Sequence, residues 1–117
     1  MIHTVLVVED EEDLRESLRE LLELNGYTVV TASDGQDALE RIAAIEHVCL
    51  VLLDLLMPRM NGWDFFVQMR LRPELAQIPV IVHSSSPQHA PEGVTRVFKK
   101  PIDVDRLLSS VREFCAA

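Results

Sequence analysis

The feature that most constrains this fold is the regular alternation of short apolar runs with longer amphipathic segments. Residues 4–8, 27–32, 48–53, 79–83 and 94–98 are apolar runs rich in β-branched side chains, which are typical of strands buried on both faces. Between the first four runs, and again after the fifth, apolar residues recur at helical spacing. Strands that alternate with helices in this way favour a parallel sheet with helices on both faces.

Composition and charge limit the classes of partner. The chain has 117 residues, 48% of them hydrophobic and 26% charged, so we expect one folded domain spanning residues 1–117. Eleven basic and 19 acidic residues give a formal net charge of −8, and an acidic surface repels nucleic-acid phosphates. The longest apolar run, residues 48–53, is far shorter than the ~20 residues of a membrane-spanning helix. We therefore expect neither direct nucleic-acid contact nor membrane contact.

The cysteines and the start of the chain predict a reducing compartment. The first residues carry no basic leader and no apolar signal core. Cys49 and Cys115 lie far apart and match no metal or redox spacing, and Cys49 falls inside an apolar run, so it is interpreted as a small core residue. A cytoplasmic location fits these features. The four histidines show no ligand spacing, and His83 is expected to pack beside the site without taking part in catalysis.

One connection is too short for the usual pattern. Only ten residues separate Ser84 from Thr95, and they include Pro87, Pro91 and Gly93. A parallel crossover usually needs a dozen or more residues, and proline disfavours helix. The helix between the fourth and fifth strands should therefore be short or missing. We expect a mobile loop or single turn that leaves Val97 or Phe98 uncovered.

Charged and polar residues follow the predicted strands. They are Glu9 and Asp10 after the first strand, Asp54 after the third, Ser84 after the fourth, and Lys100 after the fifth. Ligands of open parallel sheets bind at the carboxyl edge of the strands, and a strand order of 2-1-3-4-5 brings the three acids into one small site. Like charges at that distance need a cation among them, and Mg²⁺ suits oxygen ligands.

The charges of such a site balance. Glu9, Asp10 and Asp54 contribute −3, while Lys100 and Mg²⁺ contribute +3. A neutral site of this kind can receive a phosphoryl group, with Asp54 as the carboxylate nucleophile. Lys100, the Ser84 hydroxyl and the metal are then placed to stabilise charge on the transferred oxygens.

The residues at these strand ends form recognisable motifs. They are Val7-Val8-Glu9-Asp10-Glu11, residues 51–62 (VLLDLLMPRMNG), residues 79–85 (PVIVHSS) and Lys99-Lys100-Pro101. In this order, the chain resembles the receiver domain of two-component response regulators from Thr4 to Phe114. The resemblance implies a flavodoxin-like, doubly wound, five-stranded parallel sheet of order 2-1-3-4-5.

The resemblance also implies roles for individual residues. Asp54 corresponds to the phosphoacceptor, Glu9 and Asp10 to the acidic pair that holds Mg²⁺, and the Leu56 backbone carbonyl to a further metal ligand. Ser84 matches the switch hydroxyl, and Lys100 the lysine that precedes a cis proline. The implied phosphoryl donor is a sensor histidine kinase or a histidine phosphotransfer protein, and the implied target is an unknown downstream protein or output domain. The domain is expected to be a regulatory phosphoacceptor with intrinsic autophosphorylation and autodephosphorylation capacity.

Two departures from the family pattern keep an alternative open. Relatives often carry an aromatic residue three positions before the lysine, where this chain has Val97, and they have a full helix in the shortened crossover. A phosphorylation-independent pseudo-receiver that acts as a protein-interaction module is therefore the alternative. Asp10, Asp54, Ser84 and Lys100 together argue against it. With the crossover helix missing, we expect phosphorylation to order the crossover loop through Ser84.

Two further functions fit the sequence less well. A flavodoxin-like electron carrier needs a phosphate-binding loop after the first strand, where this chain has four acids from Glu9 to Glu12. An aspartate-based phosphohydrolase needs a second acid two residues after the nucleophile, where this chain has Leu56.

Overall fold

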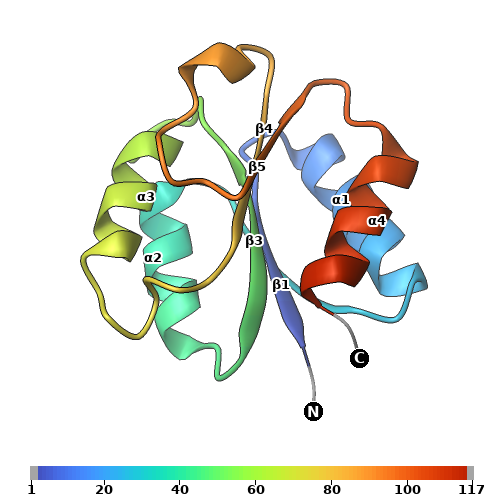
Figure 1. Cartoon of the computed structure of the whole chain (residues 1–117), viewed down its shortest axis with the longest axis horizontal. Helices are drawn as coiled ribbons and strands as arrows, with labels where there is room; N and C mark the ends of the chain where they lie inside the picture. Colours follow the sequence, from blue (N-terminus) through green and yellow to red (C-terminus); the bar gives the residue numbers. More distant parts are fainter. Residues whose placement is uncertain (1–2, 116–117) are drawn as a thin grey trace.

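The computed structural model describes residues 3–115 and contains every predicted strand (Figure 1). The strands are β1 (Thr4–Val8), β2 (Thr28–Ala32), β3 (Val48–Asp54), β4 (Val80–Ser84) and β5 (Arg96–Lys99). The helices are α1 (Glu12–Leu24), α2 (Gly35–Ala44), α3 (Gly62–Arg70) and α4 (Val104–Phe114), and a short 3₁₀-helix, η1, covers Pro87–His89. The predicted strands therefore differ from the observed ones only near their ends.

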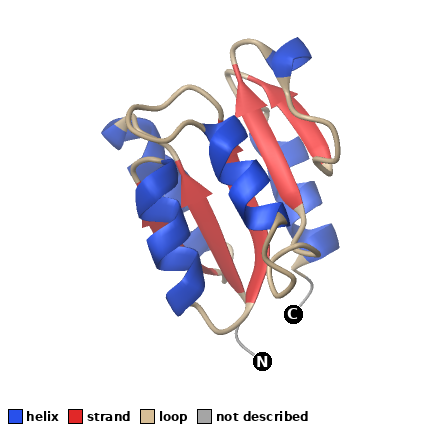
Figure 2. Ribbon diagram, turned by 90° about the vertical axis from the view of Figure 1, so that its left-hand side faces the viewer, coloured by secondary structure: helices blue, strands red, loops and turns tan. Residues whose placement is uncertain are grey.

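The five strands form one parallel sheet of order β2-β1-β3-β4-β5, which confirms the predicted fold class (Figure 2). The register pairs Val8 with Leu53 and Leu53 with Val82. Because all strands run in one direction, the residues that follow β1, β3, β4 and β5 lie along the same edge. This edge carries the candidate site.

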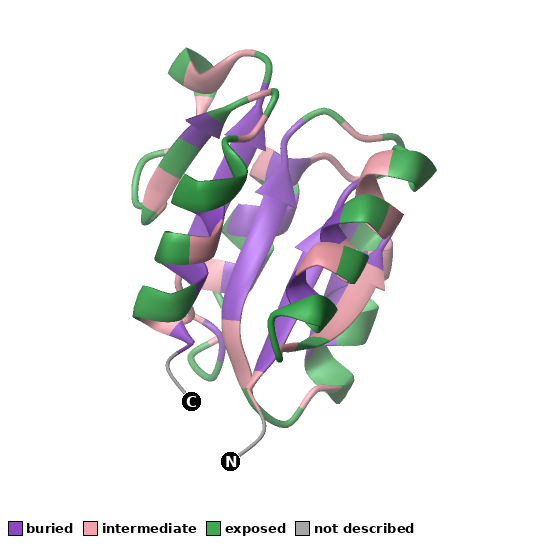
Figure 3. Cartoon of the chain, turned by 90° about the vertical axis from the view of Figure 1, so that its right-hand side faces the viewer, coloured by how far each residue is buried: buried purple, intermediate pink, exposed green. Residues whose placement is uncertain are grey.

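Helices cover both faces of the sheet. In Figure 1, α2 and α3 lie on one side of the strands and α1 and α4 on the other. Alternate strand residues enter the two cores: Leu6 and Leu53 pack on the α2/α3 side, and Val7 and Leu52 on the α1/α4 side. The strand β1 is buried along its length and β3 from Leu50 to Asp54, and Figure 3 shows the centre of the sheet as buried. Burial on both faces explains why their sequences are continuous apolar runs rather than alternating ones.

Polar residues cap the starts of three helices. The Asp34 carboxylate accepts the Asp37 N–H (2.8 Å) at the start of α2. Asn61 and Asp103 cap α3 and α4 in the same way, with distances of 2.9 and 3.2 Å. Each cap satisfies a backbone donor that has no partner within its helix. Beyond α1, Gly26 has a φ of 91°, a left-handed conformation that glycine adopts without a Cβ clash.

The crossover between β4 and β5 contains only the single turn η1, which confirms the short connection. This segment is anchored to α3, because the Trp63 indole Nε1 donates a hydrogen bond to the His89 carbonyl (2.7 Å). Ala90 and Val94 pack against the α2/α3 core. The greater mobility of the segment and its ordering by phosphorylation stay predictions.

The expectation that either Val97 or Phe98 is uncovered is correct for Val97 and wrong for Phe98. Val97 is 38% exposed, whereas Phe98 is buried. The two side chains point to opposite faces of β5. Phe98 packs in the α1/α4 core, where the Arg106 guanidinium lies 5.4 Å from its ring centroid. The short crossover therefore affects only the α2/α3 side of this strand.

Cys49 packs against the α1/α4 core, as interpreted from the sequence, but the expectation of reduced cysteines is wrong, because Cys49 forms a disulfide with Cys115. Cys49 lies near the start of β3 and Cys115 directly follows α4, with their Cα atoms 5.4 Å apart. The packing of the last helix on the sheet creates this proximity, and the sequence separation of 66 residues gives no hint of it.

Among the described residues, no helix is long and apolar enough to cross a membrane.

Reduction of the Cys49–Cys115 disulfide should lower the free energy of unfolding. A cross-link that closes a loop of 66 residues restricts the unfolded chain, and the chain-entropy estimate of its contribution is about 4 kcal/mol. Urea unfolding with and without reductant measures the difference, and the Cys49→Ser/Cys115→Ser double variant is the control on which reductant has no effect. Alkylation of both thiols in the untreated, denatured protein would contradict the bridge.

Candidate functional site

The acidic pair begins where β1 leaves the sheet. The Glu9 N–H donates to the Ala32 carbonyl (3.0 Å), so the backbone stays beside β2 for one further residue. The Glu9 Oε2 atom accepts the Glu11 N–H (3.0 Å), and Arg15 Nη1 donates to the Glu9 carbonyl (3.0 Å). These contacts hold Glu9 inside the protein, with a side chain only 1% exposed, while the next residue, Asp10, is exposed.

Asp54 is the last residue of β3 and is buried. Gly62, at the start of α3, comes so close that an added Cβ would collide with the Asp54 carbonyl oxygen and the Leu55 Cα. The Gly62 N–H donates to the Leu55 carbonyl (2.9 Å), which closes the loop between β3 and α3. A glycine is therefore needed where α3 starts beside the end of β3.

A second contact ties the same loop to α2. The Arg59 Nε atom donates to Asp34 Oδ2 (2.7 Å), and Arg59 has a φ of 63°, a region that few non-glycine residues adopt. Asp34 is buried and also caps α2. Arg15 and Arg59 are positioning residues that the sequence reasoning did not identify, because their partners are a backbone carbonyl and a residue from another loop.

The structure brings the three predicted carboxylates together. One oxygen each from Glu9, Asp10 and Asp54 lie within 4.8 Å of one another. The Lys100 ammonium lies 2.9 Å from Glu9 Oε1 and 3.4 Å from Asp54 Oδ1. The backbone N–H of Lys100 donates to the Ser84 carbonyl (2.9 Å), which fixes the position of this residue at the end of β5. Lys100 also precedes the expected cis proline, Pro101. The first, third and fifth strands thus supply one compact charged cluster.

Ser84 and Leu56 lie at the same edge in different surroundings. Ser84 ends β4 and is buried, and its hydroxyl oxygen accepts the Ser86 N–H (3.0 Å). Leu56 is the second residue after Asp54 and its side chain is 59% exposed, so the role expected for this position belongs to its backbone carbonyl. Ser84 therefore lies at the end of β4, and Leu56 lies in the loop that follows β3.

Burial and mutual repulsion shift the protonation of the acids. Burial raises the pKa of Glu9 from its ordinary 4.5 to about 7, against the lowering effect of its hydrogen bonds to Lys100 and Glu11. Burial also raises the pKa of Asp54, which Lys100 lowers and Asp10 raises. Burial lowers the pKa of Lys100, but its contacts with Glu9 and Asp54 outweigh this and leave the pKa raised. One ammonium therefore does not compensate the acids fully.

The donor set fits a hard divalent cation. All ligand atoms that converge are carboxylate oxygens, which Mg²⁺ prefers over nitrogen or sulfur. Two of the three acids are buried, so their charges are weakly screened by water. Burial is the main cause of the raised pKa of Asp54, and a cation among the acids would offset both this effect and the added repulsion by Asp10.

His83 lies beside this cluster, as expected from the sequence. Its side chain is fully buried, and its Nδ1 atom lies 3.7 Å from Glu9 Oε1. Burial lowers the pKa of His83 to about 3, so the ring is neutral at physiological pH. The sequence placed His83 at the end of the fourth strand but gave no means of identifying Glu9 as its neighbour.

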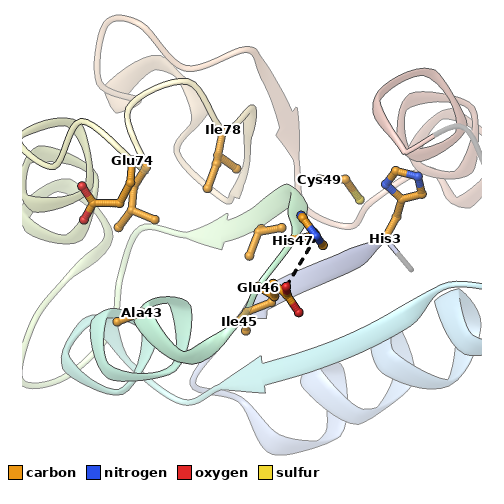
Figure 4. Close-up of a pocket in the computed structure, with 10 residues that line it drawn as sticks. His3, Ala43, Ile45, Glu46, His47, Cys49, Glu74 and Ile78 are labelled. Carbon is orange, nitrogen blue, oxygen red and sulfur yellow. Dashed lines mark ion pairs between the residues drawn. The ribbon is translucent and has the colours of Figure 1, made fainter. Parts of the chain in front are cut away.

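A separate hollow of about 450 Å³ lies around the start of β3 (Figure 4). His3, Glu46, His47 and Glu74 are among its lining residues, and the His47 ring lies 4.0 Å from the Glu46 carboxylate. Cys49 also faces it, whereas Asp54 lies at the opposite end of the same strand. Within residues 3–115, the acids at the carboxyl edge are the group that could hold a metal ion, and these histidines do not form another.

Comparison with known proteins gives one consistent match. The family model of the response regulator receiver domain matches residues 5–112. Among curated proteins, the response regulator MprA of Mycobacterium ulcerans is 38% identical over 112 residues, which are 92% of this chain and 48% of that protein. The chain thus spans about half the length of the curated relatives that it matches.

Solved structures with the same fold cover nearly the whole chain. A putative response regulator from Chloroflexus aurantiacus has a TM-score of 0.89 and 25% identity, with full coverage of both chains. The response regulator TrrA of Thermotoga maritima, solved in complex with Mg²⁺ and BeF, has a TM-score of 0.83 and 26% identity, covering 97% of this chain and 99% of that one.

The metal-free protein should lose stability as the pH rises from about 4.5 to about 7. Glu9 binds its proton more tightly in the folded state than in the unfolded state, so ionisation in this window opposes folding, and above it the loss is complete. Urea unfolding across this range measures the slope, which Glu9→Gln should reduce. Glu46→Gln, which removes an exposed carboxylate at the other end of the sheet, is the control. Equal slopes for wild type and Glu9→Gln would contradict the assignment.

Proposed function

Because this chain belongs to the family of response regulator receiver domains, we propose that it is a signalling switch that accepts a phosphoryl group on Asp54. The observation that supports this most directly is the cluster in which Asp54 lies, with Lys100 at 3.4 Å and two further acids within 4.8 Å. This arrangement combines a nucleophilic oxygen, a lysine ammonium and a place for a metal at one edge of the sheet.

The proposed reaction is a displacement at phosphorus. An Asp54 carboxylate oxygen attacks the phosphorus of a phosphohistidine, a P–O bond forms as the P–N bond breaks, and the histidine nitrogen keeps the electron pair. The nucleophile has no proton to lose when it is ionised. The Lys100 ammonium and the Ser84 hydroxyl are proposed to bind the transferred oxygens, which carry the charge in the transition state.

We propose Mg²⁺ as the cofactor, with Glu9, Asp10, Asp54 and the Leu56 carbonyl as its ligands. When bound, Mg²⁺ supplies positive charge that favours the ionised Asp54 and offsets the charge of the incoming phosphoryl oxygens. The buried Glu9 is oriented by the Glu11 N–H and by the contact of Arg15 with its carbonyl. The loop that carries Leu56 is held by Arg59 and Gly62.

The proposed partners follow from the family and from the chain's own charge. The phosphoryl donor is a sensor histidine kinase or a histidine phosphotransfer protein, and the phosphorylated state is read by a downstream protein or output domain. Residues 1–117 are proposed to act as one receiver domain. A net charge of −8 supports contact with proteins rather than with nucleic acid. The same domain is proposed to phosphorylate itself from small donors and to hydrolyse its own aspartyl phosphate.

We propose a cytoplasmic location, where kinases draw phosphoryl groups from ATP. The Cys49–Cys115 disulfide is unusual for this location, because thiols are kept reduced there.

The residues of the site also decide between the alternative functions. Asp10, Asp54, Ser84 and Lys100 support a phosphoacceptor, not a pseudo-receiver, and the four acids from Glu9 to Glu12 count against a flavin phosphate site.

Phosphorylation should be confined to Asp54. With Mg²⁺ and a small acyl-phosphate donor, the wild type should gain one phosphoryl group that is released by base, and Asp54→Asn should gain none. Intact-mass spectrometry measures the gain, and Asp64→Asn, which changes an exposed aspartate in the first turn of α3, is the control that keeps it. Equal labelling of wild type and Asp54→Asn would overturn the assignment.

Asp10 should be needed for metal binding. Asp10→Asn removes one of the three converging carboxylates. Because the loss of a residue that merely orients a metal ligand already weakens metal binding about tenfold, the Mg²⁺ affinity of this variant should fall by about tenfold or more. Titration calorimetry measures the affinity, with Asp13→Asn, at an exposed position in the first turn of α1, as the control. The same affinity in wild type and Asp10→Asn would remove Asp10 from the site.

A further inference from the structure

His83 is a buried polar residue without a hydrogen bond. Its side chain is 0% exposed, and in the described part of the chain neither ring nitrogen makes a hydrogen bond of good geometry, although the neighbouring Val8 backbone acts to raise the pKa of the ring. Buried polar groups in folded proteins nearly always have partners, because removing such a group from water is costly. An apolar residue at this position in the sheet would avoid that cost, so the imidazole requires an explanation.

The sheet register places His83 in the row that carries the site. Asp54 is paired with His83, and His83 with Phe98, and paired residues of parallel strands point to the same face. This face is the α1/α4 side, where Phe98 is buried. Ser84, the next residue, points to the opposite face. His83 therefore lies on the same face of the sheet as Asp54, on the strand between β3 and β5.

Two nitrogen atoms approach one oxygen of Glu9. The Lys100 ammonium lies 2.9 Å from Glu9 Oε1, and the His83 Nδ1 atom lies 3.7 Å from the same oxygen. The first is a hydrogen bond, and the second is just beyond hydrogen-bond length. Because the Glu9 side chain is 1% exposed, water has little access to this oxygen if the ammonium leaves.

We propose that His83 is a positioning residue for phosphoryl transfer, whose Nδ1–H replaces the Lys100 ammonium on Glu9 Oε1 when Lys100 turns to the phosphoryl group. This inference rests on the proposed function, which gives Lys100 a second partner. The imidazole stays neutral and no proton is transferred. The exchange keeps Glu9 in its orientation, with Oε2 still bound by the Glu11 N–H. It also gives Nδ1, one of the two unpaired ring nitrogens, a partner in the phosphorylated state.

Two substitutions separate positioning from packing. His83→Leu fills a similar volume but carries no donor. His83→Asn keeps an N–H group attached to the γ-carbon, as Nδ1 is in histidine. Both variants lose imidazole packing, so a purely structural role predicts similar behaviour for the two. The proposed role predicts that the asparagine variant retains function.

The first readout is the state of the ring in the wild type. The whole chain is studied by ¹H–¹⁵N NMR in Mg²⁺, before and after addition of beryllofluoride as the phosphoryl mimic. We expect Nδ1 to carry the proton in the mimic-bound state, and its resonance to move downfield and to exchange more slowly than before. A bare Nδ1, or a resonance that the mimic leaves unchanged, would overturn the proposal even if the leucine variant fails to fold.

The second readout is affinity for beryllofluoride in Mg²⁺. His83→Leu should bind it about tenfold more weakly than wild type, the scale of one hydrogen bond to a charged group, and His83→Asn should stay within about twofold. Equal affinities for all three proteins, or equal losses in both variants, would reject a positioning role. Failure of the wild type to bind the mimic would instead refute the proposed function, and this inference with it.

Discussion

Repulsion among three carboxylates at one edge of the sheet is the constraint on which the rest of the site depends. A parallel sheet directs the ends of β1 and β3 to the same place, and each of these ends in this chain carries acid. Two of the acids are buried, and a single lysine ammonium contacts both. The apolar strands hold these charges together at a free-energy cost, because burial weakens the hydration of the carboxylates. The raised pKa values of Glu9 and Asp54 are the visible result, and a divalent cation is the simplest relief.

Rigid surroundings keep the acids from separating. Apolar side chains on both faces of β1 and β3 pack in the two cores and fix these strands. The carboxylates could move apart only if one strand shifted its register against the other, which would displace the side chains in both cores. The loop after Asp54 is closed by Gly62 and tied to α2 through the pair of Arg59 and Asp34. These contacts lie outside the charged cluster, yet they determine where its oxygens point. A preorganised anionic site results, in which binding of a cation requires little rearrangement of the chain.

Much of this arrangement is predictable from the sequence, because it depends on local patterns. Apolar runs predicted the strands, and Asp34, Asn61 and Asp103, which cap helices in the structure, are residue types that favour helix starts. The convergence of the acids followed from strand polarity. Contacts between distant segments were not predictable in this way. The pairing of Cys49 with Cys115 depends on how α4 packs against β3, the burial of Phe98 on which face of β5 it occupies, and the nearness of His83 to Glu9 on the sheet register. No local pattern encodes these three contacts.

The shortness of β5 has a consequence for self-association. This strand ends the sheet, so one side of its backbone has no neighbouring strand within the described chain, and its crossover leaves Val97 exposed. An open edge of this kind invites strands from other molecules to pair with it. Here the edge is four residues long and begins and ends with a cation, Arg96 and Lys99. A second copy that pairs its own β5 with this edge, in either direction, would place like charges near one another, which opposes the growth of intermolecular sheets along β5.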